Sequence, residues 1–229
     1  MSGVHVRGSI LGNIIFNAYY NYGFVSAFVY GSQGVGKTTY ALKVMYNVYG
    51  DWDEVLGNTY FYVDDLIPRL HRCADEGKRI RCILLDDAGV WLIKYRWSER
   101  FSVWFCQLFN LIRTVCAGVI FTSVEVSDIV RFIRDKVIYR VSIRVPENPR
   151  DELDREAIGY RVFVTPTLQH WVKKVFIDRF TLRLPDDVRE RYNEMRKEAI
   201  KRLMGELRGR GSRALPDVDV DVGGLVSEI

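Results

Sequence analysis

The sequence contains few cysteines and histidines, and their spacing forms no metal-binding pattern. Its four cysteines include no C-x-x-C pair, and its three histidines are scattered. Because zinc sites need closely spaced Cys and His ligands, we expect no zinc centre. Three of the cysteines lie in apolar stretches, which favours a role as small core residues.

A large excess of charge of one sign is also absent. The 229 residues include 33 Lys and Arg against 29 Asp and Glu, which leaves a net charge of +4. This mildly basic balance permits binding to nucleic acid without requiring it. Glutamine is scarce while charged residues are abundant, a composition that favours a thermophilic source.

Signals for export or membrane insertion are missing from the beginning of the sequence. No basic segment with an apolar core and a small-residue cleavage site is present, so we expect no signal peptide. Residues 8–36 carry no charge, but Asn13, Asn17 and Asn21 interrupt this stretch, which ends in a glycine-rich loop. We therefore expect no membrane span and a cytoplasmic protein.

Apolar runs alternate with amphipathic segments through the first two thirds of the chain. Residues 10–20 fit either a short helix or an extended arm. The alternation predicts a parallel sheet with helices on both faces. Strands are expected at 24–30, 59–63, 82–85, 118–121 and 136–145, and helices at 38–49, 64–77, 101–114 and 127–134.

The last third of the chain has a different pattern. A polar segment at 146–159 reads as a loop, and 160–165 with 172–183 predict a hairpin at the sheet edge. A long helix then begins at 184, and the glycine-rich, acidic end predicts disorder. We expect an N-terminal arm (1–23), a main α/β domain (24–183), a C-terminal helix (184–208) and a flexible tail (209–229).

A phosphate loop of the form GxxxxGKT lies between an expected strand and an expected helix. Its glycines let backbone N–H groups point at a β-phosphate, and the helix adds its positive end. Lys37 would reach the β- and γ-phosphates, and the Thr38 hydroxyl would bind Mg²⁺. This context argues against an incidental glycine-rich turn. The predicted ATP-binding residues are Gly31, Ser32, Gln33, Gly34, Val35, Gly36, Lys37, Thr38 and Thr39.

Two acidic residues follow the apolar run Ile83-Leu84-Leu85. Asp86, at the end of a buried strand, is expected to hold Mg²⁺ opposite Thr38. Asp87 is expected to orient and deprotonate the attacking water. The alternative is an acidic pair that caps a turn, which the phosphate loop fifty residues earlier makes less favourable.

Hydroxyl side chains end the next expected strand. Thr122 or Ser123 could hydrogen-bond the γ-phosphate or the attacking water, and so report which nucleotide is bound. The alternative is that both are ordinary polar residues at a strand end. The neighbouring motifs favour the sensor role.

Residues 24–130 resemble AAA+ ATPases of the helicase-loader and IstB transposition-helper (DnaC/IstB) type. The resemblance rests on GSQGVGKT, VDDLIPRLHRCADEGKRIRCILLDDAG and FCQLFNLIRTVCAGVIFTS. The segment RFTLRLPDDVRERYNEMRKEAI resembles P-loop ATPases encoded by viruses and plasmids of hyperthermophilic archaea. The resemblances imply a P-loop NTPase three-layer α/β sandwich with a mostly parallel sheet, to which the pattern of the last third adds extra C-terminal edge strands and a C-terminal helix. They also imply ATP-driven DNA handling, with DNA, further copies of the chain and a helicase or other replication or packaging protein as partners.

Three departures from that family bear on its function. The catalytic Glu that is usual in the family is replaced here by Asp87, which predicts slow hydrolysis. The Asn that commonly follows the Thr-Ser pair in the family is replaced by Val124. The helical lid is replaced by strands expected between 137 and 183. This last departure favours an alternative, a DNA-packaging ATPase of the FtsK/HerA kind, whose extra strands follow the ATPase sheet.

Basic residues gather before the strand that ends in Asp86 and Asp87, and after the strand that ends in Thr122 and Ser123. The resemblance places an arginine finger for a neighbouring subunit at Arg131 or Arg134, although solvation alone also explains surface arginines. Trp97, Trp104 and Trp171 could stack on bases, while core packing is favoured for Trp104. The first basic group is Lys78, Arg79 and Arg81, and the second is Arg131, Arg134, Lys136, Arg140 and Arg144.

Two further classes of function stay open. Short chains with this phosphate loop are often small-molecule kinases, but the acidic pair and the strand-end hydroxyls favour water as the nucleophile. A nucleotide-gated interaction protein with little turnover is the other alternative, because Asp87 is a short carboxylate.

Overall fold

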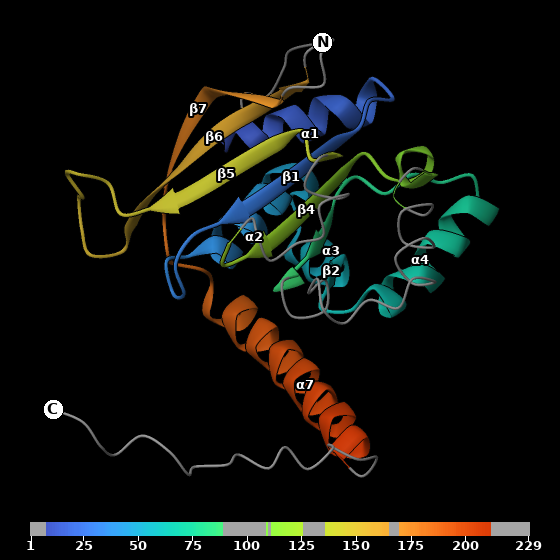
Figure 1. The fold of residues 1–229 in the computed structure, drawn as a ribbon. Helices are drawn as coiled ribbons and strands as arrows, with labels where there is room; N and C mark the ends of the chain where they lie inside the picture. Colours follow the sequence, from blue (N-terminus) through green and yellow to red (C-terminus); the bar gives the residue numbers. More distant parts are fainter. Residues whose placement is uncertain (1–7, 89–108, 110, 126–135, 165–169, 212–229) are drawn as a thin grey trace, which may run out of the picture. The chain divides into compact units, whose positions relative to one another are not determined.

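The computed structural model describes residues 8–88, 109, 111–125, 136–164 and 170–211. It divides into two compact units, Met1–Arg189 and Glu190–Ile229, and the first contains the whole sheet. The sheet has seven strands in the order β2-β3-β4-β1-β5-β6-β7 (Figure 1). They are β1 (Val25–Tyr30), β2 (Thr59–Tyr60), β3 (Ile83–Leu85), β4 (Gly118–Ser123), β5 (Tyr139–Arg144), β6 (Asp154–Val164) and β7 (His170–Thr181). The helices are α1 (Ile10–Tyr20), α2 (Lys37–Tyr49), α3 (Trp52–Gly57), α4 (Val63–Asp75) and α7 (Asp186–Gly211).

The first five strands run parallel, as the alternating pattern predicts. Strand β4 lies between β1 and β3, and its register pairs Phe121 with Leu85 and Ser123 with Tyr30. The carboxyl ends of these three strands therefore meet at one edge of the sheet. All of β3 and β4 is buried, which fits strands covered on both faces.

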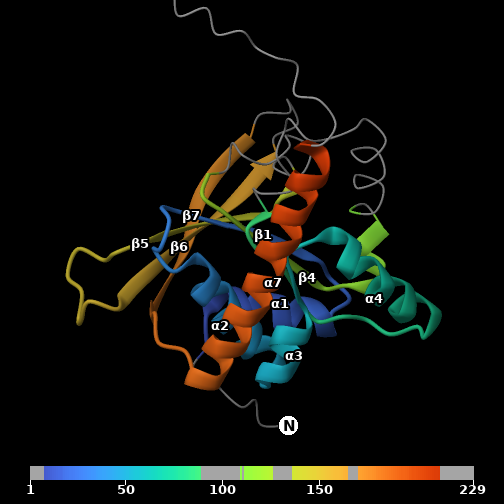
Figure 2. The same ribbon diagram turned by 90° about the horizontal axis from the view of Figure 1, so that it is seen from below.

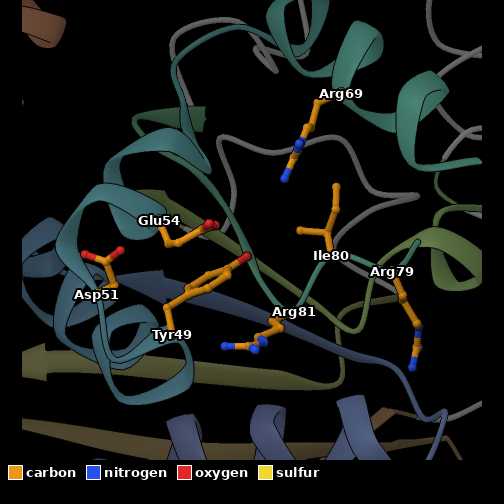
Figure 3. Close-up of a pocket in the computed structure, with 7 residues that line it drawn as sticks. All are labelled: Tyr49, Asp51, Glu54, Arg69, Arg79, Ile80 and Arg81. Carbon is orange, nitrogen blue, oxygen red and sulfur yellow. The ribbon is translucent and has the colours of Figure 1, made fainter. Parts of the chain in front are cut away.

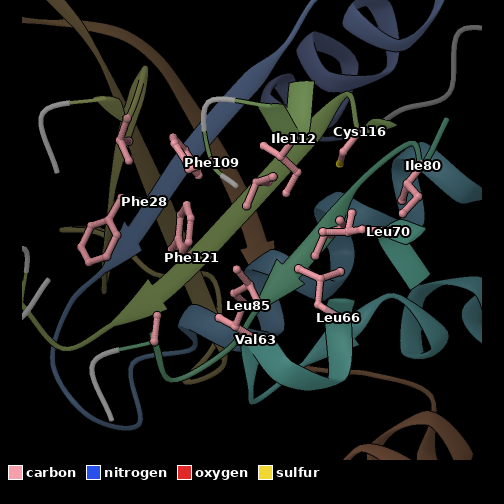
Figure 4. Packing of buried hydrophobic residues seen from close by; sticks show 14 of the residues in the cluster. Phe28, Val63, Leu66, Leu70, Ile80, Leu85, Phe109, Ile112, Cys116 and Phe121 are labelled. Atoms are coloured by element: carbon pink, nitrogen blue, oxygen red, sulfur yellow. The ribbon is translucent and has the colours of Figure 1, made fainter. Parts of the chain in front are cut away.

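Helices cover both faces of the parallel strands, giving three layers. One face packs against α4 and the segment around Phe109 through a cluster that includes Phe28, Phe121 and Leu66 (Figure 4). Alternate strand residues point to the opposite face, where α1 and α2 lie grouped with α3, apart from α4 (Figure 2). Helix α1 approaches closely, because a Cβ on Gly118 would lie 2.6 Å from Ile15 Cγ2.

The hairpin β6–β7 is antiparallel and extends the sheet beyond β5, which confirms the expected edge strands. Strand β6, however, begins at Asp154, so the loop prediction for 146–159 is wrong over its last part. The charges that suggested a loop are satisfied within the sheet, because buried Glu156 pairs with Arg144 of β5 and Asp154 accepts from the Arg150 N–H. Ala157 and Ile158, which follow Glu156 along β6, are also buried.

Other expected elements differ in smaller ways. Residues 10–20 form a helix, the first of the two alternatives, and α3 is a short helix that the pattern did not predict. The expected helix at 101–114 is described only at 109 and 111–115, where it is helical. The expected helix at 127–134 and the tail beyond 211 lie outside the described residues. Within the described part of the chain, no helix has the length and apolar character needed to cross a bilayer.

A buried acid on β7 holds α1 and α2 together. Asp178 accepts hydrogen bonds from the backbone N–H groups of Ile10 (2.8 Å) and Leu11 (3.5 Å), and from the Tyr40 hydroxyl (2.7 Å). The carboxylate thus satisfies the first turn of α1, where unpaired donors and the helix dipole both favour an anion. Burial, followed by the nearby Asp178 carboxylate, raises the pKa of the Tyr40 hydroxyl.

We predict that Asp178→Ala lowers the free energy of unfolding by about 3 kcal/mol, because it leaves three donors without their buried acceptor. Urea denaturation followed by circular dichroism measures this loss. The neighbouring exposed Arg179, changed to Ala, is the control and should leave stability within about 0.5 kcal/mol. Equal stability of the two variants would contradict the role given to Asp178.

Candidate nucleotide-binding site

The phosphate loop leaves β1 in a backbone conformation that requires glycine. Gly31, Gly34 and Gly36 have φ values of 149°, 72° and 104°, which non-glycine residues rarely adopt. Space is also restricted at two of them. A Cβ on Gly31 would lie 2.8 Å from the Ile143 carbonyl oxygen, and one on Gly36 would lie 2.2 Å from Leu182 Cδ2.

Helix α2 begins with its first N–H groups directed at this loop. Gly36 is the N-cap and has no side chain with which to cap them. Unpaired N–H groups and the positive end of the dipole make such a terminus an anion-binding site. The Lys37 ammonium lies beside it, donating to the carbonyl oxygens of Gly31 (3.0 Å) and Ser32 (2.9 Å).

Most of the predicted phosphate-binding residues are at least partly accessible to solvent. Lys37 is buried, with only 8% of its surface exposed, while Ser32, Gln33 and Gly34 are exposed at the tip of the loop. The other predicted residues, which are Gly31, Val35, Gly36, Thr38 and Thr39, are half-buried around them. A phosphate can therefore reach the N–H groups and Lys37 from solvent.

Asp86 joins three elements at the carboxyl edge of the sheet. Its fully buried carboxylate accepts from the Thr38 hydroxyl of α2, at 3.0 and 3.2 Å, and from the Thr122 hydroxyl of β4. Its backbone N–H donates to the Tyr60 carbonyl of β2 at 2.8 Å. The pair of Thr38 and Asp86, predicted from the two motifs, is thus in direct contact.

Thr122 has a role that the sequence did not predict. Its hydroxyl donates to Asp86 and accepts from the backbone N–H of Asp87 at 2.8 Å, so one side chain positions both acidic residues. Asp87 is half-buried, and its φ of 47° lies in the left-handed region, which Asp tolerates better than most residues. The strand register could have revealed this, because Phe121 pairs with Leu85 and so places Thr122 beside Asp86. Contacts of Thr122 and buried Ser123 with a γ-phosphate stay a prediction.

The donor set at this edge suits magnesium. A hydroxyl and a carboxylate are hard oxygen ligands, and Mg²⁺ is commonly held by one or two such protein groups together with substrate phosphates and water. Thr38 and Asp86 supply these groups next to the phosphate loop. The residues present therefore fit the predicted ion.

The hairpin supports the loop from behind, which the sequence also did not predict. Arg155 of β6 donates through Nε to the Val35 carbonyl at 3.2 Å and through Nη1 to the carbonyls of Glu152 and Asp154. Leu182 packs on Gly36 from the end of β7. A sequence offers no local signal for a contact between residues 120 positions apart.

Several predicted residues are not placed by the structure. Arg131 and Arg134, the expected arginine fingers, lie outside the described residues, as do Trp97 and Trp104. Trp171 is 65% exposed on β7. Its proposed stacking on bases stays a prediction.

Comparison with known proteins identifies a viral relative. No protein-family model matches the chain. Protein B-251 of Sulfolobus spindle-shape virus 1, described as uncharacterized, is 33% identical over an alignment of 209 residues that covers 86% of this chain and 83% of the relative. The chain belongs to the B-251 family. A viral member fits the expected kinship with ATPases of archaeal viruses, while the AAA+ helicase-loader type is not tested by it.

Two solved structures resemble the B-251 family chain weakly. One is the N-terminal domain of zonular occludens toxin from Neisseria meningitidis, with 12% identity and a TM-score of 0.38 over 68% of this chain and 95% of that one. The other is flagellar accessory protein FlaH from Methanocaldococcus jannaschii, with 12% identity and a TM-score of 0.39 over 74% and 97%. At these scores the likeness carries no conclusion about function.

We predict that Thr122→Val lowers the free energy of unfolding by about 2 kcal/mol, because the Asp87 N–H loses its acceptor and Asp86 loses a donor. Thr122→Ser keeps the hydroxyl and should recover most of this loss. Thermal and urea unfolding without nucleotide measure both variants. If Val and Ser behaved alike, the hydroxyl would not position the acidic pair.

Proposed function

We propose that this protein binds ATP with Mg²⁺ at the phosphate loop and hydrolyses it, and that turnover drives the handling of DNA. The observation that carries the proposal is the buried Asp86 carboxylate, held by the hydroxyls of Thr38 and Thr122 beside an uncapped helix terminus. A loop that only bound an anion would need no such acid, whereas a loop that bound phosphate together with a divalent cation would need one as a ligand of the cation.

Each residue of the site has a distinct part in this reaction. The N–H groups of α2 and the Lys37 ammonium bind the phosphates, and Lys37 exchanges its neutral carbonyl partners for charged oxygens. Mg²⁺, held through Thr38 and Asp86, would neutralise charge on the phosphate oxygens. Asp87 stands next along the chain at the site's edge, where its carboxylate accepts the proton of the attacking water.

Hydrolysis is favoured over transfer to a small-molecule acceptor. Both acids occupy the edge where the phosphate loop ends, and Thr122 fixes Asp87 to Asp86 through its backbone. This pairing supplies a metal ligand and a base side by side, and these two groups suffice when water is the nucleophile. The kinase alternative requires an acceptor pocket at the same edge.

The edge strands bear on which type of DNA ATPase this protein is. Strands β6 and β7 follow the five parallel strands where the helicase-loader resemblance implied a helical lid. This supports the second candidate, a packaging ATPase of the FtsK/HerA kind. Both candidates act as assemblies of identical subunits on DNA.

We expect that Lys37→Ala removes most ATP affinity, and that Asp86→Ala abolishes Mg²⁺-dependent hydrolysis. Asp87→Asn should bind ATP at close to the parental affinity but cleave it at least about 100-fold more slowly, because the base is lost. Radiolabelled ATP hydrolysis and equilibrium binding, measured with and without DNA at elevated temperature, test all three. Parental turnover in Asp87→Asn would exclude Asp87 as the base, and parental turnover in Lys37→Ala would overturn the proposal.

An arginine from 131–144 is predicted to complete the site of a neighbouring subunit. The transition state spreads negative charge that Lys37 and Mg²⁺ only partly neutralise, and an arginine supplied in trans raises such rates by roughly 10³- to 10⁵-fold. Mixing Lys37→Ala subunits with Arg131→Ala/Arg134→Ala subunits should restore part of the ATPase activity. A double-arginine variant that is active alone would assign these side chains another role, such as contacts to DNA phosphates.

A further inference from the structure

A second polar cavity lies at the opposite end of α2 from the phosphate loop. It has a volume of about 400 Å³ and its polar lining comes from Tyr49, Asp51, Glu54, Arg69, Arg79 and Arg81 (Figure 3). Tyr49 is the last residue of the 13-residue helix that Lys37 begins. At 1.5 Å per residue, the two sites are separated by about 20 Å. The cavity therefore cannot belong to the ATP site.

The three arginines of the cavity are not equivalent. The Arg79 guanidinium is committed to backbone carbonyls, donating to Tyr19, Arg113 and Cys116 among others. Its side chain runs away from the centre of the cavity (Figure 3). Arg79 is therefore a structural residue that joins the ends of two helices, and its hydrogen bonds are not available to a ligand.

Arg69 and Arg81 are the arginines available to a ligand. Arg81 is held by aromatic rings, with its guanidinium carbon 5.7 Å from the Tyr19 ring centre and 5.9 Å from that of Tyr49. Arg69 reaches down from α4 above Ile80 (Figure 3). Within the described part of the chain, neither forms an ion pair with a carboxylate. The two guanidinium groups lie on opposite sides of Tyr49 in Figure 3, so a single phosphate would be bound by Arg69, through paired N–H donors.

The opposite wall of the cavity carries acceptors. Glu54 points towards the hydroxyl end of Tyr49 (Figure 3), and Asp51 caps the first turn of α3 through the Asp53 N–H at 3.1 Å. Burial chiefly raises the pKa of Tyr49, with smaller electrostatic contributions from Cys82, Cys116 and Glu54. A carboxylate beside a phosphate site repels a bare anion, but it accepts hydrogen bonds from sugar hydroxyls, as acidic residues do in dinucleotide sites.

We propose that this cavity binds one ribonucleotide unit, with its phosphate on Arg69 and its ribose hydroxyls on Glu54. The volume lies within the range of small-ligand pockets, and a nucleotide fits it. Tyr49 offers an aromatic wall for the base. The unit can come from a free ribonucleoside monophosphate or from an RNA strand, and the site is separate from the proposed ATPase centre.

Calorimetric titration of the Lys37→Ala protein tests this, because that background weakens nucleotide binding at the phosphate loop. The probes are AMP, dAMP, inorganic phosphate and a ten-residue oligoadenylate. AMP should bind, and Arg69→Gln should weaken it by about tenfold or more through the lost charge-assisted bonds. Arg72→Gln is the matched control, since Arg72 lies exposed on the same helix outside the cavity. It should change AMP affinity less than about twofold.

Glu54→Gln tests the ribose contact separately. It removes repulsion and a strong acceptor together, so the ratio of AMP affinity to phosphate affinity should fall, as should the preference for AMP over dAMP. Tighter binding of oligoadenylate than AMP would assign the site to RNA, and the reverse to a free nucleotide. Absence of binding by AMP and oligoadenylate, or equal losses in Arg69→Gln and Arg72→Gln, would overturn the proposal. Because the cavity is separate from the proposed ATPase centre, Arg69→Gln with intact Lys37 should hydrolyse ATP at the parental rate. Loss of AMP binding with normal hydrolysis then concerns the cavity alone, whereas a parent protein without ATPase activity would count against the proposed function.

Discussion

The architecture of the phosphate edge depends on a single buried carboxylate. Asp86 is fully enclosed, and an ionised group in such a place is tolerated only where hydrogen-bond donors replace its water. Thr38 and Thr122 supply those donors from α2 and β4. The loop, the helix that follows it and the two strands must therefore keep one relative position. Any shift between them would leave the buried Asp86 carboxyl group without its hydrogen-bond donors. Fixed geometry of this kind is what phosphoryl chemistry requires.

The edge hairpin contributes to the same rigidity from the other side. Gly36 adopts a left-handed conformation against Leu182, and Arg155 binds the carbonyl of the adjacent Val35. Asp178 of the same hairpin holds the hydroxyl of Tyr40, one turn into α2. A segment that lies outside the parallel sheet thus determines where α2 begins. Within the described residues, the hairpin therefore holds the loop where the resemblance implied a helical lid.

The parts of the fold that could be predicted from sequence are those with local causes. Buried parallel strands appear as short apolar runs, so the strands ending at Tyr30, Leu85 and Ser123 were found, and the phosphate loop has a fixed spacing. Strand β6 was missed because a run such as Asp154–Glu156 looks solvated unless its partners on distant strands are known. The hold of Thr122 on both acids depends on strand order, and the contact of Arg155 depends on how the hairpin folds back. Neither is encoded within a local window.

Helix α2 and strand β3 lie side by side, and hydrogen bonds at both ends of the strand fix their relative position. At the carboxyl edge, Thr38 bonds to Asp86. At the amino edge, the Tyr49 hydroxyl donates to the Cys82 carbonyl at 2.6 Å and accepts from the Cys82 N–H at 3.0 Å. A helix and a buried strand resist bending over such a distance, since close-packed interiors transmit strain. Tyr49, which lines the second cavity, therefore shares with Asp86 the role of keeping Thr38 and Asp86, the proposed magnesium ligands, in register.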